Sequence, residues 1–527
     1  MRRMSKKEAL VLAALLAGCA SGVTALAVKK STPVVAPSAA AHAYAKRTTL
    51  PPVAERPTTP GFGKARGWLN ATRAPKDDEL RGRVVVVDFW TSCCINCMHT
   101  LPTLARLEKK HANDPFLVVG VHTQKFDAEP EIDRLRASVI RYGISHPVAI
   151  DGDRGIWESW GVNAWPTVIV LDTKGRVVFA DGGEPDEKEL DAVIETALAE
   201  GAEDGSLAKE PPQFVGHEIN TAHPLSFPEK IASIPGGFAI ADSGHDRIVF
   251  TDSTGKVTDI VGGGRGFADG GYQAARFAHP QGMTARGDLV YVADTENHSV
   301  RVIDRKSKTV TTIAGTGALG TARLSEGTTP AKTALRSPWD VAILNDKLYI
   351  ALAGSHQVAT LENDKLTLFA GSGQESLSDG PRLKAAFAQP SGLATDGKNL
   401  FVLDSETSSI RKIDPSGVVT TLVGHGLFVF GDKDGDGDKA RLQHPIGLTY
   451  GNGALFVADT YNAKIKRVDP SSGQTTTIAL PDKTLGEPAG LVWSSETVLL
   501  VADTNHDRIV RLDPTTRTAD TFTLSGF

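Results

Sequence analysis

A Cys-Xxx-Xxx-Cys pair, Cys94 and Cys97, is the part of this chain best suited to chemistry. It follows a continuous apolar run at 84–87 and precedes a helical pattern, which predicts a buried strand that leads into a helix. A cysteine at a helix N-terminus lies among free backbone N–H groups and the positive end of the helix dipole, and both favour its thiolate. Redox chemistry is therefore the leading interpretation.

Cysteines are scarce in the 527 residues. The four are Cys19, Cys93, Cys94 and Cys97. Because no second pair exists, the chain has no disulfide framework of the kind that staples small secreted domains. A purely structural disulfide between Cys94 and Cys97 stays open as the plain alternative, but it would close a very short loop and stabilise little.

Metal and haem sites are less well supported by the residues around the pair. A structural zinc site usually needs four ligands, and His99, His111 and His122 are the histidines that could help to complete one. A c-type haem site needs histidine directly after the second cysteine, where Met98 stands. We therefore expect neither a metal nor a cofactor.

Several separated pieces around the pair agree with one family. Asp88 lies six residues before Cys94, Pro102 falls within the following helical pattern, and 165–167 reads Trp-Pro-Thr. These pieces of 61–200 resemble thioredoxin-like proteins, particularly the TlpA-like branch. The resemblance implies an α/β thioredoxin-like fold, a buried Asp88 that relays a proton, and a cis Pro166 that faces the dithiol.

The sequence 93–97, Cys-Cys-Ile-Asn-Cys, departs from the thioredoxin pattern. Cys93 stands where thioredoxins carry tryptophan, and Ile95-Asn96 replaces Gly-Pro. This pentad resembles the thioredoxin domain of the family of NHL repeat-containing protein 2 and its bacterial relatives. Cys93 is either a small apolar filler or an additional thiol. Since the dipeptide tunes the reduction potential, the direction of electron flow stays open.

The resemblance implies a mechanism of thiol–disulfide exchange with protein thiols or disulfides as partners. Cys94 attacks as the thiolate, Cys97 resolves the mixed disulfide, and Asp88 accepts the proton of Cys97. Pro166 shapes the groove that receives the partner backbone.

The N-terminus predicts a location at the membrane. Basic residues at 2–7 precede an apolar run that begins at Ala9, as in a signal peptide. Residues 16–19, Leu-Ala-Gly-Cys, match the lipobox of bacterial lipoproteins, which would leave Cys19 acylated. Alternatively, 9–28 is long enough to span a bilayer once without cleavage. Both versions hold the domains on the extracytoplasmic side of a bacterial cell envelope.

The remaining segments divide the chain further. Residues 1–30 form the signal peptide or anchor, and 31–60 are rich in Ala, Pro, Ser and Thr, which indicates a flexible tether. A second linker is expected at 201–212. The net charge of −5 gives no argument for a nucleic-acid partner.

From residue 213 the chain repeats an apolar strand that ends in Ala-Asp-Thr or a variant. Five copies end at Asp242, Asp294, Asp404, Asp459 and Asp503, and a sixth ends at Leu352. A proline stands fourteen or fifteen residues earlier each time, at Pro228, Pro280, Pro338, Pro390, Pro445 and Pro488. Radial repetition of short antiparallel strands predicts a propeller. The units resemble NHL repeats, which implies a six-bladed all-β NHL propeller over 213–527.

The repeated aspartates are better explained by structure than by catalysis, since a short carboxylate at a strand end can accept turn amides. The acidic segment 432–438 begins like an EF-hand loop, but Gln443 stands where calcium binding needs a bidentate glutamate. Related Asp-Gly pairs at 269–270 and 379–380 favour an inter-blade turn over a calcium site.

Two functions remain. The first is a membrane-tethered thiol–disulfide oxidoreductase whose propeller binds a protein substrate. The second is a propeller scaffold for protein or envelope material, with a mainly structural thioredoxin-like domain. We favour the first, because Asp88, Cys94, Cys97 and Pro166 are all present and a structural remnant needs no second thiol.

Overall fold

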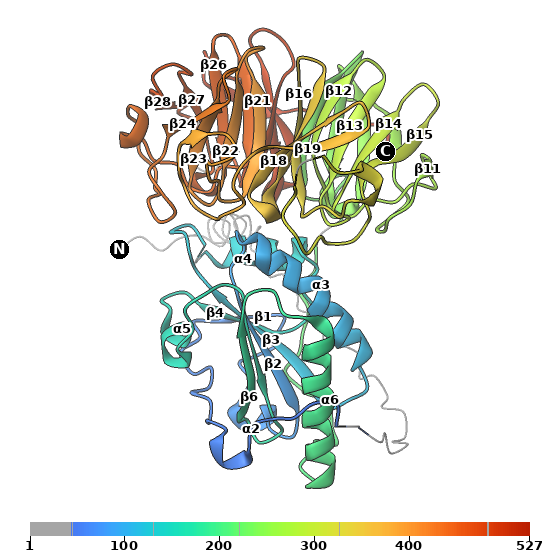
Figure 1. The fold of residues 1–527 in the computed structure, drawn as a ribbon, viewed down its shortest axis with the longest axis vertical. Helices are drawn as coiled ribbons and strands as arrows, with labels where there is room; N and C mark the ends of the chain where they lie inside the picture. Colours follow the sequence, from blue (N-terminus) through green and yellow to red (C-terminus); the bar gives the residue numbers. More distant parts are fainter. Residues whose placement is uncertain (1–43, 45, 130, 221, 326, 482–483) are drawn as a thin grey trace, which may run out of the picture.

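The computed structural model describes Tyr44 and residues 46–129, 131–220, 222–325, 327–481 and 484–527. The predicted signal peptide or anchor and Cys19 lie outside these residues. None of the helices described is both long enough and apolar enough to cross a membrane. The chain forms a thioredoxin-like domain and a propeller that pack against each other, with α4 and the start of α3 next to the propeller (Figure 1).

The thioredoxin-like domain is built, in its described residues, on a six-stranded sheet of order β1-β4-β3-β2-β5-β6. Its strands are β1 (Trp68–Leu69), β2 (Val84–Trp90), β3 (Phe116–Thr123), β4 (Val148–Asp151), β5 (Thr167–Leu171) and β6 (Val177–Gly182). Its helices are α2 (Asp77–Leu80), α3 (Ile95–Lys110), α4 (Ile132–Arg141), α5 (Gly155–Trp160) and α6 (Glu187–Glu203). Strands β2, β3 and β4 are parallel, and β5 is antiparallel to β2.

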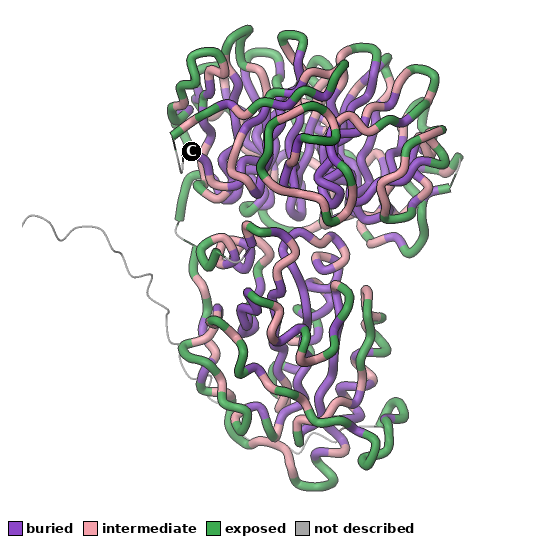
Figure 2. The backbone as a smooth tube through the Cα atoms, turned by 90° about the vertical axis from the view of Figure 1, so that its left-hand side faces the viewer, coloured by how far each residue is buried: buried purple, intermediate pink, exposed green. Residues whose placement is uncertain are grey.

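The central strand β2 is buried at all seven positions, as its run of valines predicts. Val84 and Val86 face the cluster formed with α3 and α6, and Val85 and Val87 face the cluster that includes α5. Both faces of the sheet are therefore covered, and buried strands fill the middle of the domain (Figure 2). This packing fixes the end of β2, where the dithiol follows.

The structure differs from the expected tether and linker. Residues 46–60 lie against the thioredoxin-like domain, because Leu50 joins its core and the buried Arg56 guanidinium pairs with Asp172 at 3.2 Å and Glu200 at 2.7 Å. In the expected linker 201–212, α6 continues to Glu203, Leu207 packs against the same core and the Ala208 N–H donates to the Gly82 carbonyl at 2.7 Å. Specific apolar and ionic contacts, which composition does not reveal, thus extend this domain on both sides.

The propeller comprises six sheets in the described part of the chain. Blade 1 contains β7 (Pro228–Ile234), β8 (Gly237–Asp242), β9 (Arg247–Asp252) and β10 (Val257–Val261). Blade 2 contains β12 (Pro280–Arg286), β13 (Leu289–Asp294), β14 (Ser299–Asp304) and β15 (Thr309–Gly315), with β11 (Gly270–Gly271) at its edge. Blade 3 contains β16 (Pro338–Leu344), β17 (Lys347–Leu352), β18 (Gln357–Glu362) and β19 (Lys365–Ala370).

The other three blades follow the same plan. Blade 4 contains β21 (Pro390–Thr395), β22 (Leu400–Asp404), β23 (Ser409–Ile413) and β24 (Val418–Val423), with β20 (Gly380–Pro381) at its edge. Blade 5 contains β25 (Gly447–Gly451), β26 (Ala454–Asp459), β27 (Lys464–Val468) and β28 (Thr475–Thr477). Blade 6 contains β29 (Pro488–Trp493), β30 (Leu499–Asp503), β31 (Arg508–Asp513) and β32 (Thr518–Thr521). Short 3-10 turns are η1 (Val53–Glu55), η2 (Ser243–His245), η3 (Pro330–Lys332), η4 (Ala353–Ser355), η5 (Gly437–Lys439), η6 (Thr460–Asn462) and η7 (Thr504–His506).

Blade 6 closes the ring against blade 1. The Thr504 hydroxyl donates to the Pro228 carbonyl at 2.7 Å, and the Phe227 N–H donates to Asp507 at 2.7 Å. A closed ring protects the sheet edges, as the repeat pattern predicts.

The repeated aspartates serve structure, as the sequence indicates. Each is fully buried, and its carboxylate accepts the N–H of the residue two positions before the blade proline. The donors are Ser226 to Asp242, Ala278 to Asp294, Ala388 to Asp404, Gln443 to Asp459 and Gly486 to Asp503. In the acidic segment at 432–438, Asp434 accepts the N–H and the hydroxyl of Thr477, which is the geometry of an inter-blade turn.

Candidate redox site

The structure brings the predicted redox residues together at the start of α3. Cys94 is the N-cap of the helix, and its Sγ accepts the N–H of Cys97 at 3.3 Å. The Trp165–Pro166 peptide is cis, and the Trp165 carbonyl oxygen lies 4.0 Å from the Cys94 Sγ. Cys94 is partly exposed, whereas Cys97 is buried. The accessible sulfur is thus the predicted nucleophile, and the covered sulfur is the predicted resolving thiol.

Asp88 lies below the dithiol in β2 and is completely buried. Neither of its carboxylate oxygens has a hydrogen-bond partner among the residues that the structure describes. Burial raises the pKa of Asp88 to about 7, against the opposing influence of His146. Burial also raises the pKa of Cys97 well above its ordinary value, helped by its hydrogen bond with Cys94 and by the charge of Asp88. A buried acid and a buried thiol are therefore coupled at this site.

One position of the propeller repeat lies against the thioredoxin-like domain in every blade. The residue before each blade proline has a positive φ, between 44° and 65°, although none is glycine. These residues are Phe227, His279, Ser337, Gln389, His444 and Glu487, here called the pre-proline ring. The backbone N–H that each repeated aspartate accepts belongs to the residue just before the ring member. This hydrogen bond helps to maintain the uncommon backbone conformation of the ring member.

All members of the pre-proline ring face the thioredoxin-like domain. Their contacts are Phe227 with Arg141, His279 with Tyr142, Ser337 with His99, Gln389 with Cys93 and Ile95, His444 with Phe126, and Glu487 with Arg134 and Arg141. The strand pattern in the sequence does not reveal this ring. The available signal was that one fixed repeat position carries five different side-chain types across the six blades, with histidine in two of them.

Gln389 contacts the backbone on both sides of Cys94. Its Oε1 accepts the Ile95 N–H at 3.0 Å, and its Nε2 donates to the Cys93 carbonyl at 2.9 Å. Gln389 is buried, so this side-chain amide ties blade 4 to the turn that carries Cys94. It is a positioning residue for the dithiol.

Gln389→Met keeps the side-chain volume and leaves two buried backbone groups without partners. We expect it to lower the free energy of unfolding by about 2 kcal/mol and to speed alkylation of Cys94 by a maleimide, because the turn loosens. Denaturant titration and timed alkylation measure both effects. The exposed Gln374 supplies the control, since Gln374→Met is expected to change stability by less than about 0.5 kcal/mol. Equal behaviour of the two variants would contradict the positioning role.

A buried ion-pair cluster joins α4 to the propeller. The Arg141 guanidinium lies 3.1 Å from Glu487 and 3.8 Å from Glu229, and it also donates to Asn505. All of these ion-paired groups are buried. Removing the cation would therefore leave the buried Glu229 without its ion-pair partner and Glu487 with Arg134 alone.

Arg141→Met is expected to lower the free energy of unfolding by about 3–5 kcal/mol, because unpaired buried charge is costly. Chemical denaturation of the intact chain measures the loss. The exposed pair of Arg511 and Asp520 provides the comparison, and Arg511→Met is expected to cost at most about 1 kcal/mol. A loss of similar size in both variants would show that the Arg141 cluster does not hold the domains together.

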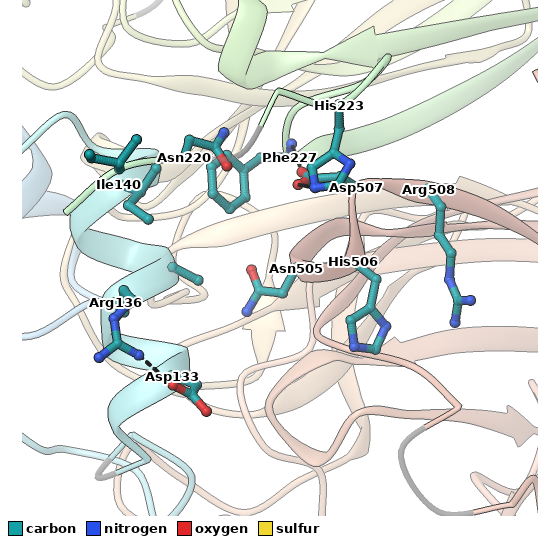
Figure 3. A pocket seen from close by; sticks show the side chains of 12 residues that line it. Asp133, Arg136, Ile140, Asn220, His223, Phe227, Asn505, His506, Asp507 and Arg508 are labelled. Carbon is teal, nitrogen blue, oxygen red and sulfur yellow. Dashed lines mark hydrogen bonds and ion pairs between the residues drawn. The ribbon is translucent and has the colours of Figure 1, made fainter. Parts of the chain in front are cut away.

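Among the described residues, cavities lie between the propeller and the helices α3 and α4. One of about 340 Å³ runs along α3 and is lined by Ile95, Met98, His99, Pro102 and, from the propeller, by His279, His298 and Trp339. The other, of about 640 Å³, lies between α4 and blades 1 and 6, with Arg136 on one side and His506 on the other (Figure 3). Only the first is adjacent to the dithiol, through Ile95, so it is the better candidate for substrate access.

Cys93 points away from this chemistry. It is fully buried and clusters with Phe126 of the thioredoxin-like domain and Tyr461 of blade 5. Burial raises the pKa of the Cys93 thiol well above its ordinary value. The structure therefore places Cys93 in a buried interface, whereas Cys94 is more accessible.

Comparisons with known proteins agree with this architecture. A thioredoxin-like family model matches residues 82–177, and an NHL repeat model matches residues 277–303. The chain is 41% identical over 470 residues to the chloroplastic protein SUPPRESSOR OF QUENCHING 1 of Arabidopsis thaliana, covering 82% of this chain and 44% of that protein. It is 36% identical over 490 residues to NHL repeat-containing protein 2 of Homo sapiens, covering 82% of this chain and 67% of that protein.

A more distant similarity is confined to the first domain. The chain is 26% identical over 117 residues to the thiol-disulfide oxidoreductase ResA of Halalkalibacterium halodurans, covering 22% of this chain and 64% of that protein. The chain thus spans less than half of the plant relative and about two thirds of the human one.

Proposed function

Because the chain belongs to the family of NHL repeat-containing protein 2, in which a thioredoxin-like domain accompanies NHL repeats, we propose that it is a thiol–disulfide oxidoreductase. The observation that carries this proposal is the assembly of Cys94, Cys97, Asp88 and cis Pro166 at one helix N-terminus. A domain kept only for its structure needs no such assembly.

The exchange has two steps that balance. The Cys94 thiolate attacks a partner disulfide, a new S–S bond forms, and one partner sulfur leaves as a thiolate. Cys97 then gives its proton to Asp88 and attacks the Cys94 sulfur, which releases the second partner thiol. The partner gains two electrons and the Cys94–Cys97 pair becomes a disulfide. With the opposite redox poise, the same steps run in reverse.

The propeller supports this function by holding the nucleophile turn through Gln389 and by forming one wall of the 340 Å³ cavity. A cavity of this kind favours an extended, cysteine-bearing protein segment as substrate. The basic and apolar N-terminal residues support a location at the membrane, outside the cytoplasm, with Cys19 as a lipidation site.

A thiol-trapping redox titration of the intact chain tests the proposal, with Cys94→Ser as the control. We expect a two-electron couple that is absent from the control. A potential near about −270 mV would indicate a reductant, and one near about −120 mV an oxidant. If no exchangeable couple exists across this range, the alternative stands, namely a propeller scaffold with a structural thioredoxin-like domain.

A further inference from the structure

Three side chains that can bind a metal meet where Cys93 enters the domain interface. They are Cys93, Glu406 from the turn after β22 in blade 4, and His444 from the pre-proline ring in blade 5. One ligand atom of each lies within 4.8 Å of the other two, and all three residues are buried. We propose that these three ligands bind Zn²⁺, whose fourth position a water molecule would take, and thereby join the thioredoxin-like domain to two blades of the propeller.

The strongest support is a pair of buried ligand atoms that lie close together without hydrogen-bond partners in the described part of the chain. Glu406 Oε1 and His444 Nδ1 lie 3.6 Å apart, and neither has a hydrogen-bond partner among the described residues. The Ser405 backbone acts on the His444 ring as a hydrogen-bond partner, whereas Nδ1 has none among the residues that the structure describes. Nδ1 therefore presents its lone pair toward the carboxylate and the thiol, as a metal ligand does.

The surroundings orient these ligands in the manner of an outer coordination sphere. Lys125 pairs with the other carboxylate oxygen of Glu406 and leaves Oε1 free. Gln389 fixes the Cys93 carbonyl, and the rings of Phe126 and Tyr461 cover the thiol. The Lys125 cation also offsets the negative charge that a Cys93 thiolate and Glu406 would bring together.

The donor set selects the ion. Thiolate, imidazole and carboxylate together suit Zn²⁺, whereas Ca²⁺ and Mg²⁺ take oxygen ligands. Zinc at about 2.0–2.3 Å from each ligand places tetrahedral neighbours about 3.3–3.8 Å apart, and the His444–Glu406 separation of 3.6 Å already fits. Such binding would assign Cys93 to structure and leave Cys94 and Cys97 as the exchanging pair.

Cobalt provides the spectroscopic probe, because Co²⁺ occupies zinc sites and reports a thiolate ligand by a charge-transfer band. The metal-free intact chain, carrying Cys19→Ser, is titrated with Co²⁺ and then with Zn²⁺. We expect one Co²⁺ per chain, a near-ultraviolet thiolate band, and displacement by one equivalent of Zn²⁺. The band should survive in a Cys94→Ser/Cys97→Ser chain and vanish in Cys93→Ser.

A second pair of variants distinguishes loss of the metal site from misfolding. Zn²⁺ is expected to raise the melting temperature of the starting chain and of His425→Gln, in which an exposed histidine is changed, but not that of His444→Gln. A band that disappears with Cys94 and Cys97 would place the ion on the dithiol and overturn the proposal. Absence of stoichiometric binding would overturn it too, leaving a protonated Cys93 beside the Lys125–Glu406 pair.

Discussion

The Cys97→Ser variant is expected to accumulate mixed disulfides through Cys94, and the Cys94→Ser variant to form none and to lose exchange activity completely. Cys94 is the partly exposed sulfur at the N-cap of α3, so it makes the first covalent contact with a partner. Cys97 is buried and reaches the bond only from inside. Removing Cys97 therefore stops the reaction after its first step.

The measurement uses a disulfide-bonded peptide with the intact chain. Non-reducing electrophoresis follows the adduct, and mass spectrometry of the digested adduct identifies the attached cysteine. The double variant Cys94→Ser/Cys97→Ser retains Cys93 and shows how much adduct this buried thiol forms by itself. Adducts on Cys93 in the Cys97→Ser chain would contradict the assignment of Cys94 as nucleophile.

Much of the redox site could be predicted because its determinants are local. The valine run at 84–87 marks a strand buried on both faces, and the cysteine spacing marks the helix start that follows it. The positions of Asp88 and Pro166 followed from resemblance to a family. The propeller could be predicted for a related reason, since six copies of one strand pattern, each tied to a proline, specify the same unit.

The docking of the two domains could not be predicted, because it depends on side chains at positions with no local pattern. Gln389 is 294 residues from Ile95 in sequence. Glutamine does not recur at this position of the repeat, so no sequence pattern marks it. The same holds for residues 46–60. Their composition is that of a flexible segment, but the structure buries Arg56 between Asp172 and Glu200. Single long-range ion pairs of this kind leave no trace in composition.

The second large effect concerns Asp88, and Asp88→Asn is expected to slow the resolving step by about 10²–10⁴-fold. The amide keeps the shape of the carboxyl group but cannot accept the Cys97 proton. Since burial raises the pKa of Asp88 to about 7, the wild-type rate should rise with pH through about 7 and then level off. The variant should lack this inflection. Stopped-flow measurement of mixed-disulfide resolution between about pH 6 and 9 records both profiles.

The same substitution is expected to stabilise the fold, because the pKa of Asp88 is raised in the folded protein. Because the pKa of Asp88 is about 7 in the fold and 3.8 ordinarily, the folded protein retains a proton that the unfolded chain releases. Stability therefore falls as pH rises from about 4 to about 7. Asp88→Asn removes this penalty, so it should gain up to about 4 kcal/mol near pH 8 and almost nothing near pH 4.

These opposite effects separate a proton acceptor from a merely structural residue. A variant that folds poorly is slower and less stable, whereas Asp88→Asn should be slower and more stable above pH 7. The exposed Asp133 in α4 provides the comparison, because Asp133→Asn should change neither the rate nor its pH profile. A wild-type profile in Asp88→Asn would rule out Asp88 as the group that receives the proton. Cys97 would then have to release its proton to another acceptor.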